Sequence, residues 1–435
     1  MERFALSRMK EWKENENRKP LIIRGARQVG KTWIMKTFGQ QYFEKTAYVN
    51  FDNNARMKQV FEGDLDIERL VLAISAETGV SIEAENTLII FDEVQEVPKA
   101  LTSLKYFYEN APQYAIVAAG SLLGVALHQG TSFPVGKVDF LDLYPLNFRE
   151  FLCAMGEKQF VSMLDSCDTQ MVTVFKTKYI ERLREYYFVG GMPEVVKDFS
   201  EKKDYNRVRA IQKNLINYYQ QDFSKHAEIK LVPRLNLVWN SIPMQLAKEK
   251  KKYIYGQVRE GSRAKDFELA IQWLLDCGLI HKVQRIQKPD LPLKAYIDFD
   301  AFKLFLVDIG LLIAMTDLDA KVIIEGNKIF TEFKGALTEQ YILQQLISDV
   351  GVIPYYYSTQ NSKGEIDFLV QGKTSVIPIE VKAEENLKAK SLKAFCEKYQ
   401  PSYAVRTSMS DYREQDWMTN IPLYAIKWIE NYVNQ

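Results

Sequence analysis

One short segment limits the fold of this chain more than any other feature of its sequence. Residues Gly25 to Thr32 read GARQVGKT, which satisfies the pattern GxxxxGK[ST], and they follow the apolar run Leu21-Ile22-Ile23. Glycines let the backbone aim its N–H groups at phosphates, and a helix that begins at Lys31 would add the positive end of its dipole. The segment therefore predicts a phosphate-binding loop between a strand and a helix.

The predicted contacts of this loop follow from the chemistry of a nucleoside triphosphate, which we expect to be ATP. Lys31 is expected to reach the β- and γ-phosphates, and Thr32 is expected to ligate Mg²⁺. The loop residues expected to contact the nucleotide are Gly25, Ala26, Arg27, Gln28, Val29, Gly30, Lys31, Thr32 and Trp33.

An acidic pair further along the chain fits the same chemistry. The apolar run Leu88 to Phe91 leads directly into Asp92 and Glu93. The two acids therefore emerge at the carboxyl end of a buried strand, where ligands bind in open α/β sheets. We expect Asp92 to hold the magnesium through water and Glu93 to polarise the attacking water. The alternative is that the pair only begins a solvated loop.

Ser121 is a further candidate for the same site. The apolar run Ala115 to Ala118 is soon followed by Gly120-Ser121, so Ser121 could contact the γ-phosphate or the attacking water. A Gly-Ser pair after a strand is also an ordinary turn. The sequence leaves both interpretations open.

Strand and helix patterns alternate along the first part of the chain, which predicts a doubly wound α/β fold. Short strands are expected at 21–23, 47–51, 88–91, 115–118 and 138–141. Three of these runs are apolar without alternation, as expected for parallel strands covered on both faces. We therefore expect a P-loop ATPase domain with a parallel sheet at residues 1–150.

Composition narrows the classes of function. The chain has 435 residues, of which 47% are hydrophobic and 26% are charged, so it is too long for one hydrophobic core and ordinary in composition. Its formal net charge of +1 excludes a chain-wide basic field. Any nucleic-acid binding must therefore come from a local patch.

Cysteine usage and hydropathy indicate the compartment. The four cysteines form no CxxC pair, which argues against a disulfide framework or a zinc site and fits a reducing cytoplasm. The N-terminus lacks the apolar core of a signal peptide, and no run of about 18 apolar residues is present. We expect a cytoplasmic protein with no membrane partner.

Five motifs occur in a characteristic order: GARQVGKT, LIIFDEVQ, AAGSLLG, DLYPLNFREF and GGMPEVV. Together they resemble the prokaryotic AAA-type ATPases, close to the signal-transducing STAND class, that carry a C-terminal domain of uncharacterised function. The resemblance spans essentially the whole chain. It implies Lys31, Thr32, Asp92 and Glu93 as the nucleotide residues and Ser121 at the sensor position.

The pattern turns helical after about residue 147, and we expect a helical lid at 151–228. Within it, Gly191-Met192-Pro193 resembles the GxP element that touches nucleotide in such proteins, with Pro193 as the contact. A helix-breaking turn explains this tripeptide equally well. An arginine finger is not assigned, because several arginines qualify: Arg27, Arg149, Arg182 and Arg184.

Residues 229–322 have the helix, helix and β-wing order of a winged helix, and Gln272 to Ile280 resembles that fold's helix-to-wing junction. Basic residues of this region could contact DNA phosphates. A charge run is also a common feature of a solvated helix end, and winged helices in ATPases also serve as regulatory packing. The basic residues concerned are Lys248, Lys250, Lys251, Lys252, Arg259, Arg263 and Lys265.

The expected C-terminal domain, residues 323–435, carries a second set of candidate catalytic residues. Glu339 lies in a predicted helix, Asp367 precedes a predicted hairpin, and Glu380 and Lys382 share one face of a strand. Carboxylates that converge with a lysine can hold Mg²⁺ and activate water against a phosphodiester. Asp367 and Glu380 are the expected metal ligands. This order resembles the PD-(D/E)XK nuclease fold, a restriction-endonuclease-like α/β domain.

Two functions stay open, both with ATP and Mg²⁺ as cofactors. The first is an ATP-driven switch or motor that acts on DNA through the nuclease-like domain. The second is a STAND-like switch whose nuclease-like domain is an inactive module for a protein partner or a second copy of the chain. Acid-plus-lysine strands also occur as plain surface ion pairs. DNA-stimulated ATP turnover favours the first function, and nucleotide-dependent assembly without DNA sensitivity favours the second.

Overall fold

The computed structural model describes residues 2–120, 133–248, 251–324, 331–359, 364–385 and 389–435. Contacts between residues divide the chain into two compact units. The N-terminal unit comprises residues 2–144 with 276–279, and the C-terminal unit comprises residues 145–275 and 280–435.

The N-terminal unit alternates strands and helices, as its sequence predicts. Its helices are α1 (Ala5–Glu14), α2 (Lys31–Tyr42), α3 (Ala55–Glu62), α4 (Ile67–Thr78), the 3₁₀ turn η1 (Val94–Glu96) and α5 (Pro98–Asn110). Its strands are β1 (Leu21–Arg24), β2 (Lys45–Asn50), β3 (Thr87–Asp92), β4 (Ala115–Ala119) and β5 (Asp139–Asp142).

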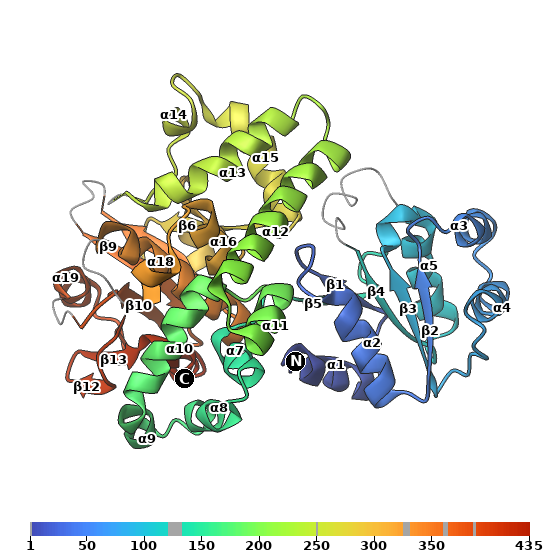
Figure 1. Ribbon diagram of the computed structural model, residues 1–435, viewed down its shortest axis with the longest axis horizontal. Coiled ribbons are helices and arrows are strands. Elements are labelled where there is room, and N and C mark those ends of the chain that lie inside the picture. The colour runs from blue at the N-terminus through green and yellow to red at the C-terminus, as the bar shows by residue number, and fades with distance from the viewer. Residues whose placement is uncertain (1, 121–132, 249–250, 325–330, 360–363, 386–388) are drawn as a thin grey trace. The chain divides into compact units, whose positions relative to one another are not determined.

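These five strands form one sheet in the order β2-β3-β4-β1-β5, and every neighbouring pair is parallel. The prediction of a parallel sheet with helices is therefore confirmed. Figure 1 shows α2 against one face of the sheet and α3, α4 and α5 against the other. Every residue of β3 and β4 is buried, which is the physical reason that these strands are apolar without alternation.

The strand order determines which loops meet. Because β4 lies between β1 and β3, the segments that follow these three parallel strands leave the same edge of the sheet as neighbours. The phosphate-binding loop follows β1, and the acidic pair Asp92-Glu93 lies at the end of β3. The sheet thus brings together two motifs about 60 residues apart in sequence, by the same rule that governs open α/β sheets.

The C-terminal unit begins with a helical segment. Its helices are α7 (Phe148–Ala154), α8 (Lys158–Asp165), α9 (Thr169–Val174), α10 (Lys176–Val189), α11 (Pro193–Lys202), α12 (Tyr205–His226), α13 (Val232–Leu246), α14 (Tyr255–Val258), α15 (Ala264–Asp276), η2 (Leu293–Tyr296), α16 (Ile309–Met315), α17 (Ala320–Ile324), α18 (Thr331–Gln345) with its π-helical end η4 (Leu346–Val350), α19 (Lys390–Tyr399), η5 (Leu423–Ile429) and α20 (Glu430–Val433). Among the residues described, no helix is both long enough and apolar enough to cross a membrane.

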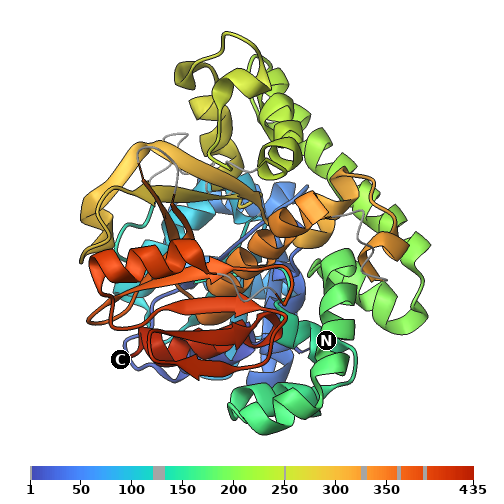
Figure 2. The same ribbon diagram turned by 90° about the vertical axis from the view of Figure 1, so that its left-hand side faces the viewer.

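A second, mixed sheet has eight strands in the order β12-β13-β11-β10-β9-β8-β6-β7. Its strands are β6 (Ile280–Ile286), β7 (Ile297–Leu306), β8 (Tyr355–Ser358), β9 (Glu365–Gln371), β10 (Val376–Val381), β11 (Val405–Ser408), β12 (Arg413–Gln415) and β13 (Met418–Pro422). β9 and β10 form the expected antiparallel hairpin. In Figure 2, α19 lies along this sheet, and its Leu392 and Phe395 belong to the same buried cluster as Ile366 of β9.

The β-wing expected at residues 229–322 is not a separate module. β6 and β7 do form an antiparallel hairpin, but β6 also pairs in parallel with β8, through Arg285–Tyr356 and Ile286–Tyr357. The hairpin is therefore one edge of the eight-stranded sheet. Strand pairing across a long sequence separation carries no local sequence signal, so the pattern of helices and hairpin alone does not reveal it.

Two adjacent glycines, Gly190 and Gly191, connect α10 to α11 through close backbone contacts. The Gly191 N–H donates to Asp308 Oδ2 at 2.6 Å, and Gly191 O accepts from Leu146 N at 2.7 Å. Asp308 is buried, and burial raises its pKa to about 6 although the backbone N–H groups of Gly191 and Leu311 act in the opposite direction. The motif GGMPEVV therefore has a packing role within this unit.

We predict that Gly191→Ala destabilises the C-terminal unit by about 1–3 kcal/mol, because inserted atoms in a packed site force backbone shifts. A Cβ at this position would lie 2.1 Å from Leu146 O. The measurement is the urea midpoint of unfolding of the full chain, followed by circular dichroism.

Gly335→Ala is the matched control. Gly335 lies inside α18, and a Cβ there meets no heavy atom within 4 Å outside the helix's own backbone. Because alanine is favoured over glycine in a helix by about 1 kcal/mol, this variant should be neutral or more stable. Equal losses of stability in the two variants would contradict the packing argument.

Candidate functional site

The phosphate-binding loop, Gly25 to Thr32, has the backbone geometry that its glycines predict. Gly25 has φ +148° and Gly30 has φ +94°, a range that side chains rarely adopt. A Cβ on Gly25 would also lie 2.1 Å from Leu143 O. Gly30 is the N-cap of α2, so the loop leads into a helix N-terminus whose N–H groups and dipole favour anions.

Lys31 lies within the loop and is held by its backbone. The Nζ atom donates to Gly25 O at 2.8 Å and to Ala26 O at 2.7 Å. Burial lowers the pKa of Lys31 to about 8, although the carboxylates of Glu93 and Asp92 act in the opposite direction. The ammonium group is thus placed at the loop by neutral carbonyl acceptors, which a phosphate can replace.

Thr32 and Asp92, the two residues of the predicted magnesium site, are in direct contact. Thr32 Oγ1 donates to Asp92 Oδ2 at 2.6 Å, which joins the first turn of α2 to the end of β3. Asp92 is almost fully buried, with 3% of its surface exposed. A hydroxyl and a carboxylate oxygen side by side are ligands of the kind that Mg²⁺ prefers.

Tyr48 is a functional candidate that nothing in the local sequence indicates. Its hydroxyl donates to Asp92 Oδ2 at 2.9 Å. Burial and the charge of Asp92 both raise the pKa of Tyr48, so it remains a proton donor to the carboxylate. The contact exists because β2 pairs with β3 in a register that sets Tyr48 opposite Ile90 and Asn50 opposite Asp92, and no local sequence motif gives this register.

Glu93, the expected base, lies at a sharp turn of the backbone. Its φ of +52° is in the left-handed region, which is uncommon for a residue with a side chain and often marks a functional position. The turn η1 follows directly, and Gln95 Nε2 donates to Glu93 Oε2 at 2.7 Å. Gln95 is a second candidate that the sequence patterns did not single out.

Three other residues are predicted to contact the nucleotide, and the structure gives less information about each of them. Trp33 points partly to solvent, with 41% of its surface exposed. Pro193 is the first residue of α11 in the C-terminal unit, so its contact with nucleotide stays a prediction. Ser121 lies outside the described residues.

Two of the four arginine-finger candidates already carry strong ion pairs within the C-terminal unit. Arg149 pairs with Asp349 and Asp165, and Arg182 pairs with Glu157 and Glu185. An arginine held in this way must break buried or half-buried pairs before it can reach a phosphate. The source of an arginine finger stays open.

The second predicted site divides into two groups, of which the first surrounds Glu339 of α18. Lys251 Nζ donates to Glu339 Oε1, and Lys303 Nζ lies 3.7 Å from Glu339 Oε2. Lys303 also pairs with Glu365 Oε1 at 2.5 Å. Burial disfavours the charged form of Lys303, but the charges of Glu339 and Glu365 outweigh it and raise its pKa.

Asp367 belongs to this group. Burial raises the pKa of Asp367 to about 8, and the negative charge of Glu339 adds to this shift. Its Oδ2 atom accepts from Val381 N at 2.7 Å. Glu339 of α18 and Asp367 of β9 are thus near enough to interact electrostatically, and the lysines that act on both are Lys251 and Lys303. A shared catalytic site at these residues stays a prediction.

The second group contains Glu380 and Lys382. Lys382 Nζ lies 2.6 Å from Glu380 Oε1, which agrees with the shared face expected from strand alternation. Glu380 Oε2 accepts from Leu392 N at 3.1 Å. Within the described ranges, no three or more His, Cys, Asp and Glu side chains are arranged to hold a metal ion. The metal expected at Asp367 and Glu380 stays a prediction.

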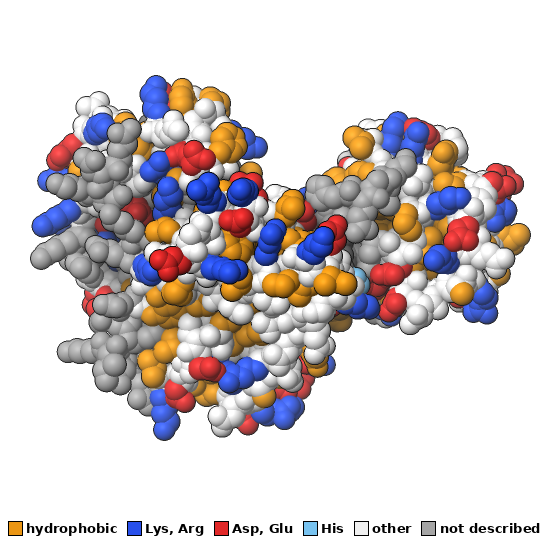
Figure 3. All heavy atoms as spheres, turned by 90° about the horizontal axis from the view of Figure 1, so that it is seen from above, with side chains coloured by type: hydrophobic (Ala, Val, Ile, Leu, Met, Phe, Trp, Pro, Cys, Tyr) orange, Lys and Arg blue, Asp and Glu red, His pale blue; other side chains and the backbone are white. Residues whose placement is uncertain are grey.

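The basic residues expected to face DNA differ in their exposure and in their ion pairs. Lys251 is bound to Glu339, whereas Lys252, Arg259, Arg263 and Lys265 are exposed. On the described part of the face in Figure 3, basic and acidic side chains are mixed with apolar ones. This agrees with the net charge of +1.

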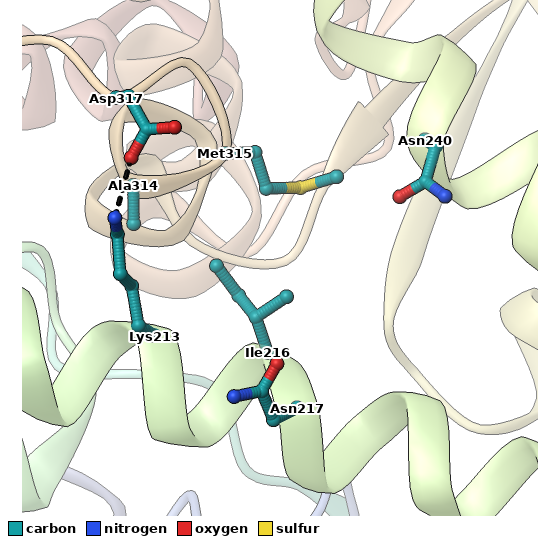
Figure 4. Close-up of a pocket in the computed structure, with 7 residues that line it drawn as sticks. All are labelled: Lys213, Ile216, Asn217, Asn240, Ala314, Met315 and Asp317. Carbon is teal, nitrogen blue, oxygen red and sulfur yellow. Dashed lines mark ion pairs between the residues drawn. The ribbon is translucent and has the colours of Figure 1, made fainter.

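One open pocket of about 330 Å³ lies between helices of the C-terminal unit (Figure 4). An ion pair between Lys213 of α12 and Asp317, at 2.7 Å, closes one side of it. The remaining lining residues are Ile216, Asn217, Asn240, Ala314 and Met315. No predicted site residue lines this pocket, and we assign it no role.

Three family models match separate parts of the chain. Residues 17–152 match an AAA domain, residues 180–322 match a domain of unknown function (DUF8612), and residues 334–426 match another domain of unknown function (DUF4143). Together with the parallel sheet and the loop, the first match identifies an AAA-type P-loop domain in the N-terminal unit. No curated protein matches the chain.

The solved structures that are similar to parts of the chain include three of low identity. A Walker-type ATPase of Pyrococcus abyssi is 15% identical, with 72% of this chain and 95% of that chain covered and a TM-score of 0.44. The Aeropyrum pernix ORC1 protein in complex with DNA is 13% identical, with 72% and 91% covered and a TM-score of 0.27. Cdc6p from Pyrobaculum aerophilum is 9% identical, with 72% and 92% covered and a TM-score of 0.25.

We predict that Tyr48→Phe weakens Mg²⁺-dependent nucleotide binding about tenfold or more, because partners that orient a metal-binding carboxylate typically contribute 10–100-fold. The measurement is titration with a fluorescent ATP analogue in Mg²⁺ and in EDTA. The loss should appear only with Mg²⁺. Tyr114→Phe, at a tyrosine that packs against the hydrophobic core of the same unit, is the control and should bind normally.

Proposed function

We propose that the N-terminal unit binds ATP with Mg²⁺ and hydrolyses it. The observation that carries this proposal is the meeting of the phosphate-binding loop with the acidic pair, through the 2.6 Å contact of Thr32 with Asp92. In this scheme Lys31 binds the β- and γ-phosphates, and Glu93 accepts a proton from the attacking water. The AAA-domain match over residues 17–152 supports the same function.

The residues present fit a magnesium ion. Thr32 and Asp92 offer hard oxygen donors, and Mg²⁺ is usually held by few protein ligands together with water and substrate phosphates. The ion would neutralise charge on the phosphates. Tyr48 keeps one Asp92 oxygen oriented, and Lys31 supplies the fixed positive charge.

We expect Lys31→Ala to lose tight ATP binding, because the phosphate charge loses its partner. Glu93→Gln should keep ATP binding and lower kcat by about 10²–10⁴-fold, since only the base is removed. Equilibrium binding and steady-state phosphate release measure the two effects. Unchanged ATP affinity in Lys31→Ala would exclude the loop as the phosphate site, and unchanged turnover in Glu93→Gln would exclude only the base.

A second function is proposed for the C-terminal unit, supported by the proximity of Glu339 and Asp367. We propose that these carboxylates take up Mg²⁺ or Mn²⁺ and act on DNA in a nuclease-like manner. The fit is incomplete, because Lys251 already balances the charge of Glu339. A divalent ion must therefore compete with the Lys251 ammonium group for the same carboxylate.

The competition predicts that Lys251→Ala increases the affinity of the nucleotide-free protein for Mn²⁺ by about tenfold or more, which corresponds to about 1.4 kcal/mol. The neighbouring exposed residue Lys252 gives the matched control, Lys252→Ala, which should bind Mn²⁺ like the wild type. Isothermal titration calorimetry measures the affinity, and thermal unfolding checks that each variant is folded. A folded Lys251→Ala protein without improved Mn²⁺ binding would rule out the competition.

DNA assays separate this function from the STAND-like switch. Mg²⁺-dependent nicking that disappears in Asp367→Ala while ATP turnover persists supports the nuclease-like function. Nucleotide-dependent assembly with no response to DNA supports a protein-interaction module instead. ATP turnover with and without DNA is the first experiment, because it distinguishes the two with wild-type protein.

A further inference from the structure

A local turn of the chain places Gln95 next to Glu93, the expected base. Asp92 ends β3, Glu93 adopts a left-handed backbone conformation, and Val94 to Glu96 form the 3₁₀ turn η1. This sharp reversal places the side chain of residue 95 beside that of residue 93. The resulting hydrogen bond, Gln95 Nε2 to Glu93 Oε2, is 2.7 Å long.

The hydrogen bond determines which way the Gln95 amide points. An ionised carboxylate only accepts hydrogen bonds, so the NH₂ group of the amide must face Glu93. The carboxamide oxygen, Oε1, therefore faces elsewhere. It is buried and has no hydrogen-bond partner among the described residues.

A buried acceptor without a donor is costly. Leaving such a group unsatisfied typically costs about 1–3 kcal/mol, and native proteins contain only a few such atoms per hundred residues. The Gln95 oxygen lies on the same amide as the group bound to Glu93, so it is a few ångströms from the expected base. A donor that satisfies it must enter at that place.

We propose that Gln95 is a positioning residue that, with Glu93, orients the attacking water of ATP hydrolysis. Water has two protons and two lone pairs. One proton is donated to Glu93 and the other to Gln95 Oε1, which leaves a lone pair free to face the γ-phosphorus. This inference rests on the proposed hydrolysis of ATP.

The step balances without a further reactant. The water oxygen forms a bond to the γ-phosphorus, and the bond from this phosphorus to the β–γ bridging oxygen breaks. The electron pair of that bond leaves with ADP, and the proton of the water passes to Glu93. Gln95 exchanges no proton, because an amide neither gains nor loses one here, and it acts only by fixing the orientation of the water.

The test compares Gln95→Leu with the wild type in two assays. Leucine has a similar volume but neither donates nor accepts hydrogen bonds. We expect kcat to fall about 10–100-fold, the cost of a misplaced reactant, while affinity for a non-hydrolysable ATP analogue changes less than about twofold. Binding of ADP with aluminium fluoride, which mimics the transition state with its water in place, should weaken in parallel with kcat.

A matched control comes from the same turn. Glu96 is exposed and adjacent to Gln95, and Glu96→Ala should leave both kcat and analogue binding unchanged. Gln95→Asn, which keeps both amide groups on a shorter side chain, should recover part of the lost kcat. Such recovery is not expected if residue 95 only fills space.

Three outcomes overturn the inference in different ways. If the wild type hydrolyses ATP and Gln95→Leu keeps its kcat, the role of Gln95 is wrong and the proposed function stands. If the wild type binds ATP but releases no phosphate under any condition tested, the proposed hydrolysis fails and this inference fails with it. Parallel loss of ATP-analogue affinity and kcat in Gln95→Leu would assign Gln95 to the fold of the loop instead.

Discussion

The contact between Thr32 and Asp92 is the constraint on which the N-terminal unit depends. It joins the first turn of α2 to the end of β3. It can form because β1, β4 and β3 are parallel neighbours, so that the segments after β1 and β3 leave the same edge of the sheet. The loop predicted to bind phosphate and the carboxylate predicted to bind its metal thus meet, although neither motif is near the other in sequence. Asp92 can remain buried because Thr32 and Tyr48 both donate to it, and a buried carboxylate needs such donors.

The sequence predicts those parts of this arrangement that are local. The pattern GxxxxGK[ST] specifies positive-φ glycines and a helix start, and both are present at Gly25 and Lys31. Non-alternating apolar runs specify strands covered on both faces, as β3 is. The contacts of Tyr48 and Gln95 cannot be predicted from local sequence patterns, for different reasons. The first acts through a neighbouring strand, and the second acts through a turn whose geometry depends on one unusual backbone angle at Glu93.

In the C-terminal unit, the contacts that the sequence does not predict come from residues far apart in the chain. The order of the motifs predicts that Glu339 and Asp367 lie near each other, and in the structure the charge of Glu339 acts on Asp367. The lysines that neutralise Glu339 come from residues 251 and 303, far away in sequence and outside the motif. The same non-local pairing of β6 with β8 merges an expected β-wing into the large sheet. The spacing of the motif residues predicts which carboxylates are candidates for the site. It does not predict the lysines that neutralise their charge.

The two carboxylate sites differ in how firmly their lysines are held, and this difference bears on what each can do. Lys31 is bound by two neutral carbonyl oxygens, whose hydrogen bonds are weaker than those to a charged partner. A triphosphate can therefore displace them with a gain in electrostatic energy. Lys303 is fully buried between Glu339 and Glu365, and removing one partner of a buried ion pair typically costs about 3–5 kcal/mol. The N-terminal lysine is thus arranged for exchange with a ligand, whereas Lys303 is a permanent counter-ion. Of the two lysines that the described residues place against Glu339, Lys251 is the partly exposed one, and a metal ion could displace it at lower cost than Lys303.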